Sequence, residues 1–262
     1  MKKVIVLAAD KNYLEHVKSI IINCKQEGKW CYDFCLIANN IDEIDLIDFK
    51  KLGVYLFHIN ETNKFMPTIY IFDYFFKKWD YVMYLDLDII IFDNLEKITI
   101  DLKDSKNDIL VLLEPWAISE YFCQRMSKYD REIKLKELEN IYDIHKFGFN
   151  AGFLYFNSNL IKKETLSEII FLTKKYKHIN NHLSEEGTDQ AILNLYFNKN
   201  TISIQNDKFI GHPNINDKTI CVHLFHKPWL NDSFCERYNK TFKEKYLENI
   251  IKFNTTVSLS KI

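Results

Sequence analysis

Two aspartates, Asp86 and Asp88, stand one residue apart inside a run of apolar residues, Val82–Leu85 before them and Ile89–Phe92 after them. Buried in such a segment, two unpaired carboxylates would cost many kcal/mol, so a cation must meet them. Residues two apart in an extended chain point to the same side. Such a pair suits a hard or borderline divalent ion that keeps open positions for phosphate oxygens. Alternatively, the acids cap a strand end or pair with lysine and arginine. The apolar flanks favour the metal site.

The elements that position these acids follow from the hydrophobic pattern of the first half of the chain. Short apolar runs predict strands over 3–9, 32–37, 54–59 and 81–85. Between them, apolar residues at helical spacing predict helices over 12–27, 41–52 and 66–78. This alternation predicts a doubly wound parallel sheet with right-handed crossovers. Ligands of such sheets bind at the carboxyl ends of the strands, where Asp86 and Asp88 stand.

The second half is less regular. It predicts strands over 109–113 and 219–225, and an apolar segment with a glycine over 149–156. Helices are expected over 159–177, 188–197 and 236–253, and the charged stretch 117–146 reads as largely helical with no strand signal. The sequence has no repeat, no low-complexity tract and no linker. We therefore expect one domain over 1–262.

Composition bounds the function classes. The 262 residues are 47% hydrophobic and carry 35 basic and 36 acidic side chains, so no global basic field exists to hold a nucleic acid. No apolar stretch is long enough to span a membrane. The six cysteines form no C-x-x-C pair, which favours free thiols and a cytoplasmic protein over a disulfide or zinc framework. The basic stripe of 236–253 suggests weak membrane contact, but its spacing fits core packing better.

Five stretches of the chain match, in order, the motifs of one enzyme family. They are the opening Ala8–Tyr13, the Y-L-D-x-D segment Tyr84–Ile90, the F-N-A-G segment Phe149–Phe153, the D-Q-x-x-L-N segment Glu186–Asn194 and the closing K-P-W segment His223–Trp229. Together they resemble the family 8 retaining glycosyltransferases, which include glycogenin, galactinol synthase and the lipopolysaccharide α-glycosyltransferases. The resemblance spans about residues 3–230. It implies an α/β fold of the Rossmann-like GT-A type, with a mainly parallel central sheet flanked by helices.

The resemblance assigns the metal site. It implies that Asp86, Asp88 and His223 bind Mn²⁺, with Mg²⁺ as the alternative ion. Mixed carboxylate and imidazole ligation suits manganese better than calcium. Such an ion, as a Lewis acid, would stabilise the diphosphate that departs from a nucleotide-sugar. Lys227 is expected to add a positive charge to that leaving group.

The resemblance also implies where the nucleotide and the sugar bind. It places the uridine against the opening loop, with Tyr13 stacked on uracil, and assigns catalytic or sugar-contacting roles to Asn150, Asp189 and Gln190. Gln190 would lie below the anomeric carbon, which favours same-face displacement over a covalent glycosyl intermediate. The remaining expected nucleotide-sugar contacts are Ala8, Ala9, Asp10, Asp86, Leu87, Gly152 and Glu186.

The sequence departs from the family pattern in three places. Thr68 or Tyr70 stands where the family has a lysine or arginine facing the phosphates, with Lys64 as a possible substitute. The closing segment is two residues short, so His226 competes with His223 as a ligand. Glu186 replaces an aspartate.

The stretch 117–147 resembles an insertion that, in this family, covers the donor and contacts the acceptor. We expect Glu114, just before it, to meet a sugar hydroxyl. A charged helix that forms a solvated face with no role is the plain alternative.

The expected function is that of a retaining, metal-dependent hexosyltransferase. UDP-glucose and UDP-galactose are the favoured donors, and UDP-GlcNAc and UDP-xylose stay open. The acceptor is a hydroxyl of a glycan, a lipid or a protein, and the oligomeric state is open. One alternative is a nucleotidyltransferase, but such an enzyme would have a basic, Gly-rich loop after the first strand, and Ala8–Tyr13 is not one. The other is a catalytically impaired protein that only binds the nucleotide-sugar, which the missing cation near Thr68 suggests.

Overall fold

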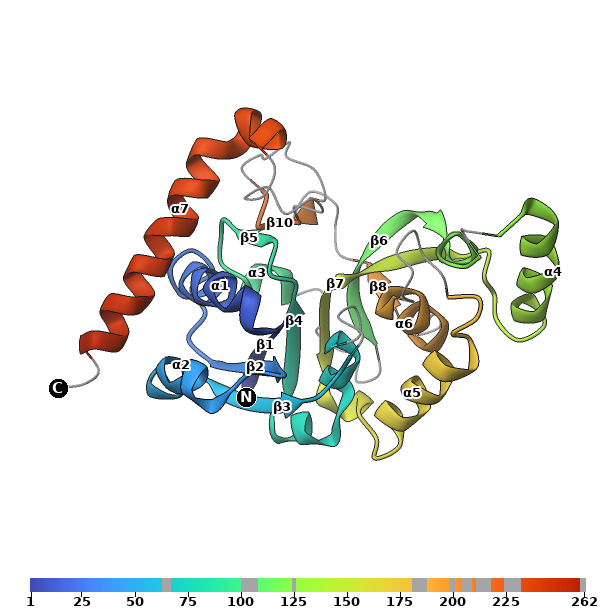
Figure 1. Cartoon of the computed structure of the whole chain (residues 1–262), viewed down its shortest axis with the longest axis horizontal. Helices are drawn as coiled ribbons and strands as arrows, with labels where there is room; N and C mark the ends of the chain where they lie inside the picture. The colour runs from blue at the N-terminus through green and yellow to red at the C-terminus, as the bar shows by residue number, and fades with distance from the viewer. Residues whose placement is uncertain are drawn as a thin grey trace.

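The fold is built on a seven-stranded sheet, seen in a computed structural model of the chain (Figure 1). The structure describes residues 1–62, 67–99, 108–123, 126–180, 188–197, 201–203, 209–210, 218–223 and 232–259. The strand order is β3-β2-β1-β4-β7-β6-β8. The strands are β1 (Lys3–Ala9), β2 (Asp33–Asn39), β3 (Tyr55–Ile59), β4 (Tyr81–Leu85), β6 (Ile109–Ala117), β7 (Phe147–Asn157) and β8 (Thr201–Ser203).

The sheet is mainly parallel, as the alternation of strands and helices predicts. Strands β3, β2, β1 and β4 pair in parallel, as do β6 and β8, while β7 runs antiparallel to both of its neighbours, β4 and β6. The predicted α/β class is therefore confirmed. The antiparallel β7 brings a mid-strand segment to the carboxyl end of β4, because Leu85 pairs with Phe153.

Both faces of the sheet are covered by apolar side chains. Along β1, Ile5 and Leu7 belong to one buried cluster and Val4 and Val6 to the other, as the period of two in a strand requires. The first cluster includes side chains of α1 (Leu14–Gln26) and of the C-terminal helix α7 (Asp232–Leu259). The second includes side chains of α5 (Thr165–Lys175) and α6 (Asp189–Phe197). A strand buried on both faces reads as a continuous apolar run, which is why β1 is visible in the sequence.

Helix α7 lies against α1 on the outside of the molecule (Figure 1). It spans 28 residues, longer than the predicted 236–253. Phe253 is fully buried, and its ring centroid lies 5.2 Å from that of Phe49. The part of the stripe that the structure describes therefore packs onto the core, as its spacing favours. Among the described residues, no helix combines the length and the apolar character that crossing a membrane needs.

A second, small sheet holds the last predicted strand. Strand β10 (Cys221–His223) pairs antiparallel with β5 (Ile89–Ile91) and parallel with β9 (Phe209–Ile210). In this register His223 lies opposite Ile89, the residue that follows Asp88. The small sheet therefore carries a late histidine to the two aspartates.

Several predicted helices are shorter than expected or of another type. The segment 66–78 forms two 3-10 helices, η3 (Pro67–Phe72) and η4 (Tyr74–Lys78). Its β-branched and aromatic residues are weak helix formers, and the Asp73 carboxylate accepts a hydrogen bond from the Phe75 N–H, which interrupts the segment. The expected helix over 41–52 is a 3-10 turn, η2 (Glu43–Leu46), followed by α2 (Ile47–Lys51).

The stretch 117–146 is only partly helical. Ala117 is the last residue of β6, and η6 (Ile118–Tyr121) and α4 (Lys128–Glu139) follow. Ala117 pairs with Phe147, the first residue of β7, so this excursion starts and ends at adjacent positions of the sheet. The other short elements in the part of the chain that the structure describes are η1 (Lys11–Tyr13), α3 (Glu96–Thr99) and η7 (Ser158–Leu160).

Candidate active site

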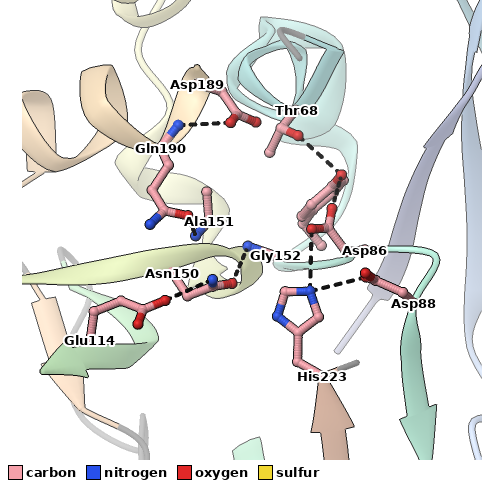
Figure 2. A network of polar contacts seen from close by, with 11 residues as sticks. Thr68, Asp86, Asp88, Glu114, Asn150, Ala151, Gly152, Asp189, Gln190 and His223 are labelled. Carbon is pink, nitrogen blue, oxygen red and sulfur yellow. Dashed lines mark hydrogen bonds and ion pairs between the residues drawn. The ribbon is translucent and has the colours of Figure 1, made fainter. Parts of the chain in front are cut away.

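Two aspartates and one histidine come together at the carboxyl end of β4 (Figure 2). The His223 Nε2 lies 3.0 Å from Asp88 Oδ1 and 3.6 Å from Asp86 Oδ2. One ligand atom from each of the three residues can be chosen so that all lie within 4.8 Å of one another. His223 is only 3% exposed. The predicted triad is thus brought together, and two carboxylates with one imidazole fit a divalent cation.

The charges at this cluster favour a cation. Burial lowers the pKa of His223, but the hydrogen bond to Asp88 and the charges of Asp88, Asp86 and Glu114 outweigh it and raise the pKa above its usual value. Three carboxylates thus surround one imidazole. A divalent ion on the same side chains would take over the charge compensation and would need His223 in its neutral form.

Gly152 is packed closely against Asp86, Asn150 and His223. The Asp86 N–H donates to the Gly152 carbonyl at 2.8 Å. A Cβ atom at residue 152 would lie 2.4 Å from His223 Cε1, 2.7 Å from Asp86 Oδ2 and 2.8 Å from Asn150 Oδ1. Only glycine fits without displacing the candidate metal ligands.

Asn150 is held at both ends of its amide. Its Nδ2 donates to Glu114 Oε1 at 2.9 Å, and its Oδ1 accepts from the Gly152 N–H at 2.8 Å (Figure 2). Both Glu114 and Asn150 are buried. Burial raises the pKa of Glu114, while its hydrogen bond from Asn150 and the charge of His223 oppose the rise. Asn150 therefore connects the acid on β6 to the glycine beside the triad.

The first turn of α6 presents Asp189 and Gln190 to the same space. The Gln190 Oε1 accepts from the Ala151 N–H at 3.3 Å. Asn194, one turn later and fully buried, accepts from the Phe149 N–H and donates to the carbonyls of Phe149 and Gln190, each at 2.8 Å. This bridge fixes α6 against β7, and with it the position of Gln190.

Thr68 is one of the two residues, with Tyr70, that stand where the family resemblance predicts a cation. It is buried, and its hydroxyl donates to the Tyr84 hydroxyl at 3.0 Å, which in turn donates to Asp86 Oδ1 at 2.7 Å. Thr68 therefore supplies a hydrogen bond but no positive charge. Tyr70 donates to Glu61 at 3.1 Å, away from this relay.

The opening loop, where the family resemblance places the nucleotide, directly follows β1. Ala8 and Ala9 end β1, which pairs in parallel with β4. The Asp10 carboxylate caps η1 by accepting from the Asn12 N–H at 2.8 Å. Tyr13 ends that turn, with its ring centroid 5.5 Å from that of His16. Leu87 lies between the two aspartates and is half-buried.

Four residues of the expected site lie outside the described residues: Glu186, Lys227, His226 and Lys64. Sequence reasoning missed the roles of Tyr84 and Asn194, although both stand inside the quoted motifs. Their polar groups bond to other parts of the same site, and the pairing of side chains across the fold leaves no periodic signal.

The family itself is decided by comparison with known proteins. The model of glycosyl transferase family 8 matches residues 67–233, more than half of the chain. The chain belongs to glycosyl transferase family 8. The resemblance read from the five motifs is thereby confirmed. No curated protein sequence matches the chain.

Solved structures agree with the GT-A fold of family 8. The galactosyltransferase LgtC superposes with a TM-score of 0.65 at 17% identity, over 94% of this chain and 95% of LgtC. The glycosyltransferase GlyE of Streptococcus pneumoniae TIGR4 has a TM-score of 0.63 at 19% identity, over 98% of this chain and 65% of GlyE. The bifunctional glycosyltransferase WbbM has a TM-score of 0.61 at 17% identity, over 95% of this chain and 49% of WbbM. The chain thus spans just under two thirds of GlyE and about half of WbbM.

Proposed function

We propose that this family 8 glycosyltransferase moves a hexose from a UDP-sugar to a hydroxyl of a glycan, lipid or protein, with retention of configuration and with Mn²⁺ as its ion. UDP-glucose or UDP-galactose is the preferred donor. The observation that carries the proposal is the Asp86–Asp88–His223 cluster, which lies at the carboxyl end of a parallel strand beside the amide of Gln190. The similar galactosyltransferase LgtC was solved in complex with donor and acceptor sugar analogues, which supports transfer of a sugar from a donor to a sugar acceptor.

The chain's residues have defined tasks in this proposal. Asp86, Asp88 and His223 would hold the ion, which supplies Lewis-acid stabilisation of the departing diphosphate. Lys227 would add a second positive charge there, and Asp189 would accept hydrogen bonds from sugar hydroxyls. The acceptor oxygen bonds to the anomeric carbon as the bond from that carbon to the diphosphate oxygen breaks, and the acceptor proton passes to the diphosphate. Gln190 carries an amide, which is a poor nucleophile, so this same-face route is favoured over a covalent intermediate.

Calorimetry with UDP tests the metal and the nucleotide together. We expect UDP to bind weakly in EDTA and much more tightly after Mn²⁺ is added, because Asp86 and Asp88 otherwise repel the diphosphate. Asp88→Asn should abolish this gain and the transfer activity while the fold stays intact. The matched control is Asp93→Asn, which removes a carboxylate that pairs with Lys97. Equal UDP affinity with and without the ion would refute the metal-dependent donor site.

The stereochemistry of the product tests the retaining mechanism. An α-linked donor should give an α-linked product, which NMR of the anomeric proton distinguishes from a β-linkage. A β-linked product would contradict the same-face route.

Mn²⁺-dependent UDP binding with no turnover of any of the four UDP-sugars would favour the impaired binder, which the uncharged Thr68 suggests.

A further inference from the structure

Tyr121 is the last residue of η6, the 3-10 helix that packs against α6. Its side chain is buried, with 4% of the residue exposed. The ring lies over Gly148 on β7, where a Cβ atom would come within 2.4 Å of Tyr121 Cε2 and 2.8 Å of its hydroxyl oxygen. The chain therefore has a glycine where this tyrosine needs room. Two residues later on β7 is Asn150, part of the candidate active site.

The Tyr121 hydroxyl is buried and makes no hydrogen bond of normal geometry within the structure described. Burial and the charge of Glu114 raise the pKa of Tyr121, while weak hydrogen bonds from the side chains of Gln190 and Trp116 to the hydroxyl oxygen lower it in part. The group is therefore a neutral O–H donor. Its neighbours come from β6 and from the first turn of α6, the two elements that carry Glu114 and Gln190. A buried hydroxyl left unbonded is unfavourable for folding, so its retention calls for an explanation.

We propose that the Tyr121 hydroxyl donates a hydrogen bond to an oxygen of the hexose held beside Gln190. This proposal rests on the proposed function, because it takes Gln190 as the residue below the sugar. It adds a sugar-contacting residue from the excursion between β6 and β7. The excursion then contributes to the site from its buried first turn, separately from the charged helix α4.

The test compares Tyr121→Phe with the wild type and with Tyr176→Phe. Tyr176 is a matched control because it is also 4% exposed, its hydroxyl likewise makes no hydrogen bond of normal geometry within the described structure, and its ring lies next to that of Tyr142. Three quantities are measured for each protein: the melting temperature without ligand, the affinity for UDP with Mn²⁺, and the affinities for UDP-glucose and UDP-galactose with Mn²⁺.

Tyr121→Phe should melt no lower than the wild type, because within the described structure the lost O–H donates to no acceptor with normal geometry. Its affinity for UDP should be unchanged. Its affinity for whichever UDP-hexose the wild type binds should fall roughly 3- to 10-fold, which is the effect of losing one neutral hydrogen bond. Tyr176→Phe should keep all affinities. Because no acceptor is added, a loss in this assay assigns the contact to the donor hexose. Unchanged UDP-hexose affinity with transfer alone impaired would place it on the acceptor and overturn the proposal.

Two further outcomes separate this proposal from the proposed function. If the wild type binds neither UDP-hexose, the proposed function fails and this proposal fails with it. If the wild type binds and Tyr121→Phe binds equally well, only this proposal fails. A lower melting temperature with unchanged UDP-hexose affinity would show that the hydroxyl has a structural partner instead.

Discussion

The two oxygens of the Asp86 carboxylate have different partners, which fix the orientation of the group. Its Oδ1 accepts from Tyr84, which Thr68 fixes in turn, and its Oδ2 points towards His223. One oxygen is thus held by the protein while the other faces the space between the candidate ligands. Outer hydrogen bonds of this kind set the direction and basicity of metal ligands.

Glu114 gives a residue-scale prediction about the role of its charge. Glu114→Gln keeps an oxygen that can accept from Asn150, so transfer activity should fall only a few-fold. Glu114→Ala leaves the Asn150 amide without this partner and loosens its hold on Gly152, so activity should fall about 10- to 100-fold, as for other outer contacts of a metal site. Steady-state kinetics of both variants is the measurement. An equal loss in both would mean that the negative charge, and not the hydrogen bond, is needed.

Asp189 gives a prediction about pH. Burial and the charge of Asp86 raise its pKa to about 7, although Thr68 and the Gln190 N–H lower it in part. The folded protein therefore holds a proton that the unfolded chain loses above about pH 4. The stabilising contribution of this group is present below about pH 4 and is lost as the pH rises through about 7.

Asp189→Asn should consequently raise the melting temperature of the metal-free protein at pH 8 and change it much less at pH 5. Thermal melts in EDTA at both pH values measure this. Glu132→Gln, an exposed change on α4, is the control and should have no effect at either pH. A change in melting temperature of equal size at pH 5 and pH 8 would show that the surroundings of Asp189 do not disfavour its ionised form.

At the scale of elements, α7 reaches the opening loop through a row of aromatic side chains. The His16 ring on α1 lies 5.5 Å from Tyr13 and 5.1 Å from Tyr246 on α7, measured between ring centroids. Lys245 on α7 also pairs with Glu27 after α1, at 3.0 Å. The position of Tyr13, the expected uracil contact, thus depends on how the last helix packs.

Tyr246→Ala should therefore weaken UDP binding several-fold while Mn²⁺ binding stays unchanged, because the triad lies on other elements. Tyr246→Phe should keep the wild-type affinity for UDP, since the ring of residue 246 makes the contact with His16. Leu247→Ala removes an exposed side chain from the same helix and is the control. Calorimetry with UDP measures all three. A matching loss in Leu247→Ala would point to general loosening of α7.

Over the whole molecule, the sequence predicts local patterns well and long-range pairing poorly. The strands of the first half are apolar runs that turns and helices separate, so their positions along the chain and their parallel direction could be predicted. Asp86 and Asp88 could be recognised as site residues because carboxylates flanked by apolar strand residues are costly to bury without a cation. The direction of β7 was not, since a period of two is the same for parallel and antiparallel strands.

Tyr121 was invisible for a related reason. It sits in a charged stretch with no strand pattern, and its importance lies in contacts with Gly148 and Gln190, which are distant in the sequence. The helical pattern of the 66–78 segment did not reveal its 3-10 type, because β-branched and aromatic residues can fill a helical stripe and still favour tighter turns.

The register of β10 against β5 has a consequence in the thermodynamics of the chain. An ion on Asp86, Asp88 and His223 joins the end of β4 to a strand near the C-terminus, and so closes the loop from residue 88 to residue 223. Only the folded chain has this arrangement, so the ion binds the native state in preference to the unfolded one. Stability should then rise with the logarithm of ion concentration above its Kd. Melting temperatures across a Mn²⁺ titration would show this rise, and His223→Ala would remove it, so the stability of the fold would report the concentration of the free ion.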